Sequence, residues 1–343
     1  MPSGPNVSTM PQQITLEELR RLVRQPVEVF FRTRMGVKLD GVDEIAQEEE
    51  PFSLNGLEKY QVGKELLEAA DASLALNCIQ MAGRLPMAAF GAREAAEFNE
   101  KVTVVLERRV IWEQQYPHGV PAQSIALTVD DVAITGTLAG LKSQQDAAST
   151  EVDSVVEHAG TGDTAAWLQL NQRLGAVAEG KDEDLTARVH IVAGLWINHL
   201  AACASGMSLV SVQLGLDEQV VFNGMAKEEA LEILHRLVTA YKAAWERPLP
   251  VACKTAWAYL QAQIKADRLA IDKPDKEVKD PHEAAQLVFE GDYYKGELTE
   301  SAYLARTFED YEDIEEELPY WAKLLYGDMA QHVQVGRQAG ASA

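Results

Sequence analysis

Cysteine is scarce in this sequence. Cys78, Cys203 and Cys253 lie far apart along a chain of 343 residues. Three widely spaced thiols suit neither a disulfide framework nor a clustered zinc or iron–sulfur site, so both classes are excluded. We expect buried, unreactive thiols, because free cysteine is usually packed as a small apolar side chain.

Long apolar runs and a surplus of basic residues are also missing. No apolar stretch approaches the length needed to cross a bilayer, and the first 13 residues lack the charged and apolar regions of a signal peptide, which predicts a cytoplasmic protein without membrane contact. The formal net charge is -22. Because binding to nucleic acid draws on Lys and Arg that replace counterions, any contact with phosphates must come from a local patch.

Signatures of common catalytic sites are absent too. The chain contains no GxGxxG, Walker, HExxH or GxSxG pattern, and its seven histidines are scattered. His190 and His199 form the nearest pair that could bind a metal, but no carboxylate or cysteine joins them at ligand spacing, so packing histidines are favoured. The sequence therefore predicts no catalytic residue, no cofactor and no metal site.

One stretch organises what is present. Residues 122–141 alternate apolar with small or polar residues on either side of Asp130-Asp131, which predicts a β-hairpin at the start of a sheet. Gly136 lies inside the second strand, where a missing side chain indicates close approach by another group. Many enzymes that cut nucleic acids carry a Mg²⁺-binding aspartate at the end of such a strand, and here that position is Ala139.

The basic residues gather near the N-terminus. Thr15 and Glu18 form a capping box, which predicts a helix start, and Pro26 suits the first turn of a second helix. The two helices carry most of the local positive charge, as Arg20, Arg21, Arg24, Arg32, Arg34 and Lys38. These residues form either a solvated helix face or a patch that contacts DNA phosphates.

Further along, the pattern mixes helices with short strands. We predict a long helix over 92–112 with Val110 facing inward, a buried strand that runs into a helix over 188–206, a hairpin over 209–222 and a helix over 226–245. The fold class is therefore α/β, a short mixed sheet flanked by helices. The expected domain covers 14–332 with an acidic insertion over 144–185, between a disordered linker over 1–13 and a flexible tail over 333–343.

Each of two charged stretches has a non-functional and a functional interpretation. Pro274 to Lys279 spells the letters of the PD-(D/E)XK nuclease motif, but a single residue separates its two halves and no strand pattern surrounds it, which indicates coincidence. Glu309 to Glu317 places seven carboxylates in nine residues. That stretch is either a solvated turn or a site for a basic partner.

Short segments along the chain together resemble the C-terminal domain of the RecC family, the gamma chain of exodeoxyribonuclease V. Each segment is weak alone, and their shared order along the sequence carries the resemblance. The segments are Leu16-Glu17-Glu18-Leu19, Pro26 with Phe30-Phe31, Glu49-Glu50-Pro51-Phe52, Tyr60-Gln61, Leu85-Pro86 with Phe90-Gly91, Trp196-Ile197-Asn198-His199-Leu200, Tyr241 with Pro248-Leu249, Phe289-Glu290-Gly291, Gly296-Glu297 and Tyr303-Leu304-Ala305-Arg306.

The resemblance implies a PD-(D/E)XK nuclease-like fold that has lost its active site. It also implies a place in the RecBCD helicase–nuclease, with RecB-like and RecD-like subunits and DNA as partners, where the domain helps to split the duplex and docks RecD during repair of double-strand breaks and homologous recombination. Ala139 fits this loss, and Val189 to Leu195 contains no Asp-x-Lys or Glu-x-Lys. Related domains with an iron–sulfur cluster place a cysteine where this chain has Gln25.

Our leading hypothesis is a non-catalytic domain that guides DNA and assembles with partner subunits. The basic residues named above are its candidate DNA contacts. One alternative is an active nuclease with a displaced acid set, Asp130, Asp131 and Glu107. Another is a purely structural scaffold.

Overall fold

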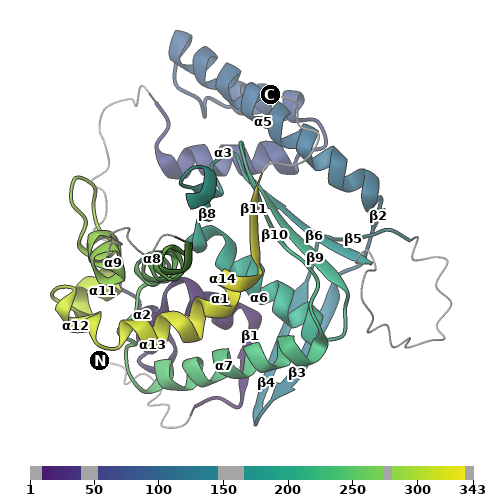
Figure 1. Ribbon diagram of the computed structural model, residues 1–343. Helices are drawn as coiled ribbons and strands as arrows, with labels where there is room; N and C mark the ends of the chain where they lie inside the picture. The colour runs from purple at the N-terminus through teal and green to yellow at the C-terminus, as the bar shows by residue number, and fades with distance from the viewer. Residues whose placement is uncertain (1–9, 40–52, 146–165, 273–279, 337–343) are drawn as a thin grey trace, which may run out of the picture.

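The computed structural model describes residues 10–39, 53–145, 166–272 and 280–336, and Figure 1 shows sheets flanked by helices. A three-stranded sheet has the order β1-β4-β3, a six-stranded sheet has the order β11-β10-β9-β6-β5-β2, and β7 pairs with β8. The strands are β1 Gln13–Thr15, β2 His118–Gly119, β3 Gln123–Val129, β4 Val132–Leu138, β5 Leu141–Ser143, β6 Trp167–Gln172, β7 Ala178–Glu179, β8 Thr186–Ala187, β9 Leu209–Leu214, β10 Gln219–Phe222 and β11 Val333–Gly336.

Both larger sheets mix parallel and antiparallel pairs. β1 runs parallel to β4 and β6 runs parallel to β9, whereas the other neighbours in these sheets are antiparallel. The expected α/β class with short mixed sheets flanked by helices is therefore confirmed. Within the described ranges, no helix combines the length and the apolar character that a membrane span requires.

The predicted hairpin over 122–141 is confirmed as β3 and β4. Val129 pairs with Val132 across the turn, and Asp130 has a positive φ of 55°. The turn is tied to helix α7, Lys227–Glu246, because Asp130 accepts a hydrogen bond from His235 at 2.9 Å and Asp131 accepts one from Lys242 at 2.9 Å. The hairpin thus reaches across to a helix that lies about a hundred residues later in the chain.

Gly136 is where another element approaches the strand, as the sequence indicates. A Cβ atom at this position would lie 2.7 Å from Cδ1 and Cγ of Leu16, the first residue of helix α1, Leu16–Arg24. Leu16 is almost fully buried. The absent side chain therefore lets α1 pack directly on β4.

Gly136→Ala is expected to lower the free energy of unfolding by about 1–3 kcal/mol, because the added methyl overpacks against Leu16. Urea denaturation of Gly136→Ala, Leu16→Ala and the double variant measures the coupling between the two positions. The smaller Leu16→Ala side chain should remove most of the Gly136→Ala penalty, and strictly additive effects would contradict this packing.

Helices cover both faces of the six-stranded sheet. Alternation along β9 sends Leu209 into one core and Val210, Val212 and Leu214 into another. Helices α3, Gly56–Glu68, α4, Ala72–Met81, and α5, Ala88–Gln115, form a layer over the second core (Figure 1). The other elements are α2 Pro26–Val29, η1 Phe30–Arg34, η3 Asp182–Asp184, α6 Val189–Ala204, α8 Cys253–Asp272, α9 Pro281–Glu290, α10 Glu297–Glu300, α11 Ala302–Thr307, α12 Glu312–Glu315, α13 Leu318–Ala322, η4 Lys323–Gly327 and α14 Asp328–His332.

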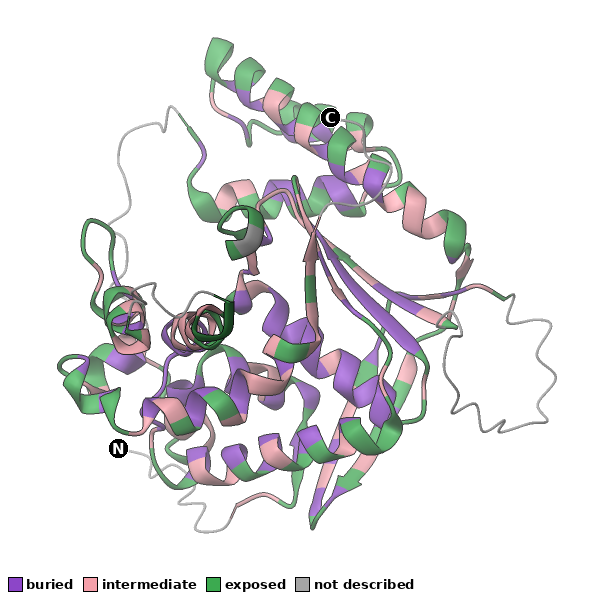
Figure 2. Cartoon of the chain, in the orientation of Figure 1, coloured by how far each residue is buried: buried purple, intermediate pink, exposed green. Residues whose placement is uncertain are grey.

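The buried strand predicted at the start of 188–206 is wrong, because helix α6 already begins at Val189. Of its 16 residues, 13 are buried, and Figure 2 shows the burial along its length. A helix packed on all sides has no polar face, so its apolar run lacks the 3.6-residue period that would distinguish it from a strand.

Val110, predicted to face inward on α5, is instead 48% exposed.

The predicted boundaries need three corrections. β6 lies between β5 and β9, so residues 166–172 belong to the central sheet rather than to an insertion; residues 146–165 lie outside the described ranges. The expected tail begins with a strand, since β11 pairs with β10. Gln12 and Gln13 belong to the fold instead of a linker, because Gln12 accepts a hydrogen bond from Ala133 and Gln13 begins β1.

The two ends of the described chain meet in the interior. The hydroxyl of Tyr326, in η4, donates a hydrogen bond to the carbonyl oxygen of Val23 at 2.9 Å. Tyr326 is fully buried. The core around α1 is therefore completed by a segment about three hundred residues later.

Candidate functional site

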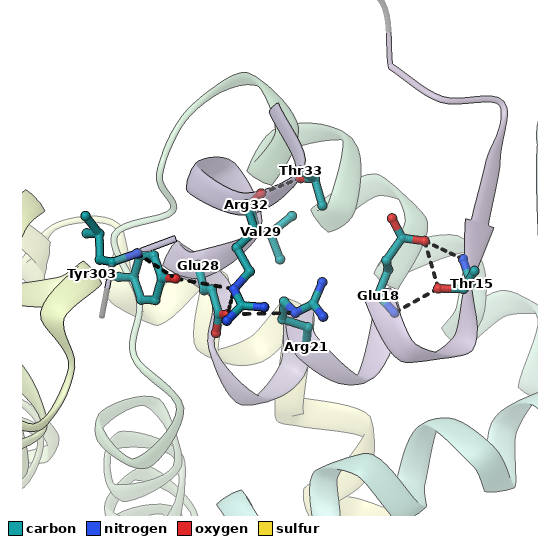
Figure 3. Close-up of polar contacts among 9 residues, drawn as sticks. Thr15, Glu18, Arg21, Glu28, Val29, Arg32, Thr33 and Tyr303 are labelled. Carbon is teal, nitrogen blue, oxygen red and sulfur yellow. Dashed lines mark hydrogen bonds and ion pairs between the residues drawn. The ribbon is translucent and has the colours of Figure 1, made fainter. Parts of the chain in front are cut away.

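The basic segment begins with a tightly held helix start. Thr15 and Glu18 form the predicted capping box, in which the Thr15 amide donates to the Glu18 carboxylate at 2.7 Å and the Glu18 amide donates to Thr15 Oγ1 at 3.2 Å (Figure 3). Pro26 occupies the first turn of α2, as predicted. The helices α1, α2 and η1 therefore carry five of the six candidate DNA contacts, and Lys38 follows η1 on the same segment.

Two of these arginines converge on one buried carboxylate. Arg32 forms an ion pair with Glu28, and Arg21 Nε lies 3.9 Å from the same Glu28 Oε1. Figure 3 shows dashed lines from both arginine side chains to the Glu28 carboxylate. Arg32 Nε also donates a hydrogen bond to the Tyr303 hydroxyl at 3.3 Å. These contacts give Arg32 and Arg21 a structural role within the domain.

Arg20 and Arg34 also have partners inside the chain. Arg20 donates to Asn198 Oδ1 at 2.9 Å and to Glu17 at 2.8 Å. Arg34 donates to the carbonyl oxygens of Trp245 and Glu246 at 3.2 and 3.3 Å, where α7 ends. Cations are favourable at a helix C-terminus, so Arg34 stabilises the end of α7.

Arg24 differs from these four arginines, because it opens onto a cavity. Its guanidinium packs over α6, where a Cβ atom on Gly194 would lie 2.4 Å from Nη2. The cavity has a volume of about 310 Å³, and charged groups of both signs line it: Arg24, Lys254, Glu28, Glu297 and Glu300, beside His190. Desolvation of the imidazole and the charges of Lys254, Arg173 and Arg188 lower the pKa of His190 to about 4, so this histidine is neutral at pH 7. Lys38, the sixth candidate, is exposed.

The position expected for a metal-binding aspartate lies where the chain passes between sheets. Ala139 is exposed and directly follows β4, and Gly140, with a φ of 72°, bends the chain into β5. β4 thus belongs to the three-stranded sheet and β5 to the six-stranded sheet. A methyl group therefore occupies the strand end where a metal-binding aspartate is expected in related nucleases.

The strand beside β5 is β6, and the sequence reasoning missed its polar face. Leu141 pairs with Gln169, and across the sheet Gln169 pairs with Ser211 and Asn171 with Gln213. Gln169 is 5% exposed, and its Oε1 has no hydrogen-bond partner among the described residues. The alternation in Trp167-Leu168-Gln169-Leu170-Asn171 is the signal that could have identified this strand.

The displaced acid set is not brought together. Among the residues that the structure describes, no group of three or more His, Cys, Asp or Glu side chains could hold a metal ion, so Asp130, Asp131 and Glu107 do not form such a group. A hydrogen bond from Lys242 lowers the pKa of Asp131. The two aspartates therefore serve to anchor the hairpin to α7.

The two histidines singled out in the sequence lie in different environments. His199 is fully buried, and its Nδ1 lies 3.0 Å from Ser211 Oγ, while its ring stacks on Trp196 with centroids 5.8 Å apart. Burial lowers the pKa of His199 to about 4. His199 is thus a packing histidine, whereas His190 lines the cavity beside Arg24.

All three cysteines are free, and the expectation of burial holds for Cys203 and Cys253. Cys78 is exposed, so the expectation is wrong there. The stretch from Pro274 to Lys279 that spells a nuclease motif lies outside the described residues.

The acidic stretch 309–317 is largely exposed, but its last carboxylate has a partner. Arg247 forms an ion pair with Glu317, and Nη1 donates to Oε1 at 2.9 Å. That pairing lowers the pKa of Glu317. Glu309, Asp310, Glu312, Asp313, Glu315 and Glu316 remain at the surface.

Comparison with known proteins identifies the family. The chain is 28% identical over 290 residues to the RecBCD enzyme subunit RecC of Escherichia coli K12, an alignment that covers 82% of this chain and 22% of that protein. It is 29% identical over 93 residues to the same subunit of Haemophilus influenzae, covering 26% of this chain and 8% of that protein. The chain thus spans about a fifth of the length of the E. coli relative. A family model for the RecC C-terminal domain matches residues 11–264, and the chain accordingly belongs to the RecC C-terminal domain family.

Proposed function

We propose that this chain is a non-catalytic, PD-(D/E)XK nuclease-like domain of a RecBCD-type helicase–nuclease. In this role it guides or splits DNA at a fork and docks partner subunits, one of them RecD-like, during repair and recombination. The family match and the two relatives named RecBCD enzyme subunit RecC support the assignment to such an assembly.

The observation that carries the proposal is the chemistry of two positions, the end of β4 and the strand β6, which lies beside β5. PD-(D/E)XK nucleases place an aspartate at the end of one strand and Glu-x-Lys on the next, so that these groups hold a metal beside the scissile phosphate. In this chain Ala139 follows β4, and Gln169-Leu170-Asn171 lies on β6, the neighbour of β5. We propose that the alanine methyl and the two neutral amides stand in place of the two carboxylates and the amine that this chemistry needs.

Guiding DNA requires only a few phosphate contacts. Arg20 pairs with Glu17, and Arg21 and Arg32 both pair with Glu28, which reduces the charge that the basic segment offers to DNA. Arg24 is the strongest candidate, because its guanidinium opens onto the cavity beside Lys254. A weak and strongly salt-dependent interaction is the expected outcome.

The 343-residue chain should bind a labelled forked duplex at low salt and leave it uncut in Mg²⁺ or Mn²⁺. Fluorescence anisotropy over a salt series gives the binding constant, and a denaturing gel of the same samples shows cleavage. Arg24→Ala is expected to reduce the slope of log K against log salt by about 1, as loss of one phosphate contact does.

Arg93→Ala is the matched control, since Arg93 is an exposed arginine on α5. An unchanged slope in Arg24→Ala would remove Arg24 from the DNA contacts, and a chain that binds no DNA would favour the purely structural scaffold. DNA cleavage that is lost in Asp131→Ala would overturn the non-catalytic assignment.

A further inference from the structure

Two tyrosines project from the loop between α9 and α10. Tyr293 is 89% exposed and Tyr294 is 81% exposed, among the highest values for large apolar side chains in the described residues. The loop extends beyond α9 at the edge of the molecule (Figure 1). Two large aromatic rings are thus held in solvent side by side.

The loop is held in one conformation by its own backbone. Gly291 has a φ of 82°, and it forms a β-bridge with Lys295. A Cβ atom would lie 2.3 Å from the Tyr294 carbonyl oxygen at Gly291 and 2.2 Å from the Glu290 carbonyl carbon at Gly296. The two tyrosine rings meet edge to face with centroids 5.2 Å apart. A partner would therefore meet aromatic groups whose conformational entropy is already reduced.

The acidic stretch adjoins the base of this loop. Glu290, the residue before Gly291, accepts a hydrogen bond from the Tyr311 amide at 3.0 Å, and the rings of Phe289 and Tyr311 are 6.1 Å apart. We define the Tyr–acid surface as Tyr293 and Tyr294 together with the exposed carboxylates Glu309, Asp310, Glu312 and Asp313. Lys295 is the cation within the loop.

We propose that the Tyr–acid surface docks a protein partner that has a basic face and an apolar pocket for the two rings. Tyrosine is enriched among the residues that dominate interface energies. The carboxylates repel phosphates but attract lysine and arginine, so charge favours a basic protein over DNA. This inference rests on the proposed function, because it places the partner among the other subunits of the same complex.

The test uses this 343-residue chain with the RecB-like and RecD-like subunits of its own organism. Affinity for each subunit is measured by biolayer interferometry at several salt concentrations. Tyr293→Ala with Tyr294→Ala should weaken one subunit's binding about 100-fold, the size expected for two central aromatic contacts. Glu309→Lys with Glu312→Lys should slow its association about tenfold at low salt and flatten the salt dependence.

Tyr60→Ala, an exposed tyrosine on α3, is the matched control and should leave both affinities unchanged. If wild type and all variants bind the subunits equally, the Tyr–acid surface is not the docking site, although the proposed function stands. If wild type binds neither subunit, the proposed function itself fails. If the tyrosine variant binds forked DNA more weakly but keeps its affinity for both subunits, the proposal of a protein partner is wrong. The two rings would then stack on DNA bases.

Discussion

Arg32→Ala should lower the free energy of unfolding by about 3 kcal/mol, because it leaves a buried carboxylate without its main partner. Glu28 is 5% exposed, and the other arginine near it, Arg21, has its Nε 3.9 Å from Oε1. The hydrogen bond from Arg32 to Tyr303 is lost as well. Urea denaturation followed by circular dichroism measures the change.

Glu28→Gln in the Arg32→Ala background removes the stranded charge and should recover a large part of the lost stability. Arg24→Ala is the companion control, since Arg24 packs over Gly194 and forms no ion pair with a carboxylate among the described residues, so its effect should stay below about 1 kcal/mol. A fully stable Arg32→Ala variant with weakened DNA binding would instead make Arg32 a DNA contact.

Acidification should destabilise the protein through His199. Its pKa is about 4 in the fold and 6.5 as the ordinary value, so the unfolded chain takes up the proton first as the pH falls. Stability supported by the neutral imidazole is therefore fully present above pH 6.5 and declines as the pH falls toward 4. The loss attributable to this residue is about 3 kcal/mol across that interval.

His199→Gln should flatten this part of the stability curve, because the amide does not titrate. His190 has its pKa lowered in the same direction, so the comparison is made between wild type and His199→Gln at each pH rather than on wild type alone. Equal pH dependence in the two proteins would show that His199 contributes nothing to acid sensitivity.

Local signals in the sequence predicted the elements whose causes are local. The capping box at Thr15, the turn at Asp130 and the amphipathic helix α7 each depend on residues within a few positions of one another, and all three are present. Gly136 was informative for a similar reason, because a glycine within a strand indicates by itself that another group approaches the backbone. These features can be predicted without knowing which other element packs against them.

The failures arise where distant residues decide the outcome. α6 is buried on all sides, and that burial depends on elements far along the chain. The predicted basic patch depended on charge counts alone. In the fold its arginines bind Glu28, Asn198 and the end of α7, and a charge count does not reveal these partners. The strand β6 was assigned to an insertion because its neighbour in the sheet, β9, follows about forty residues later.

The hydrogen bond between Tyr326 and Val23 has a consequence for biosynthesis. Its partners are separated by 303 positions, and β11 joins its sheet from the last described residues. Contacts of such long sequence separation slow folding, because the chain must close a large loop before they form. A ribosome that makes this polypeptide must therefore release nearly all of the domain before the N-terminal helix gains its final neighbour, which leaves the nascent chain dependent on protection from aggregation until synthesis ends.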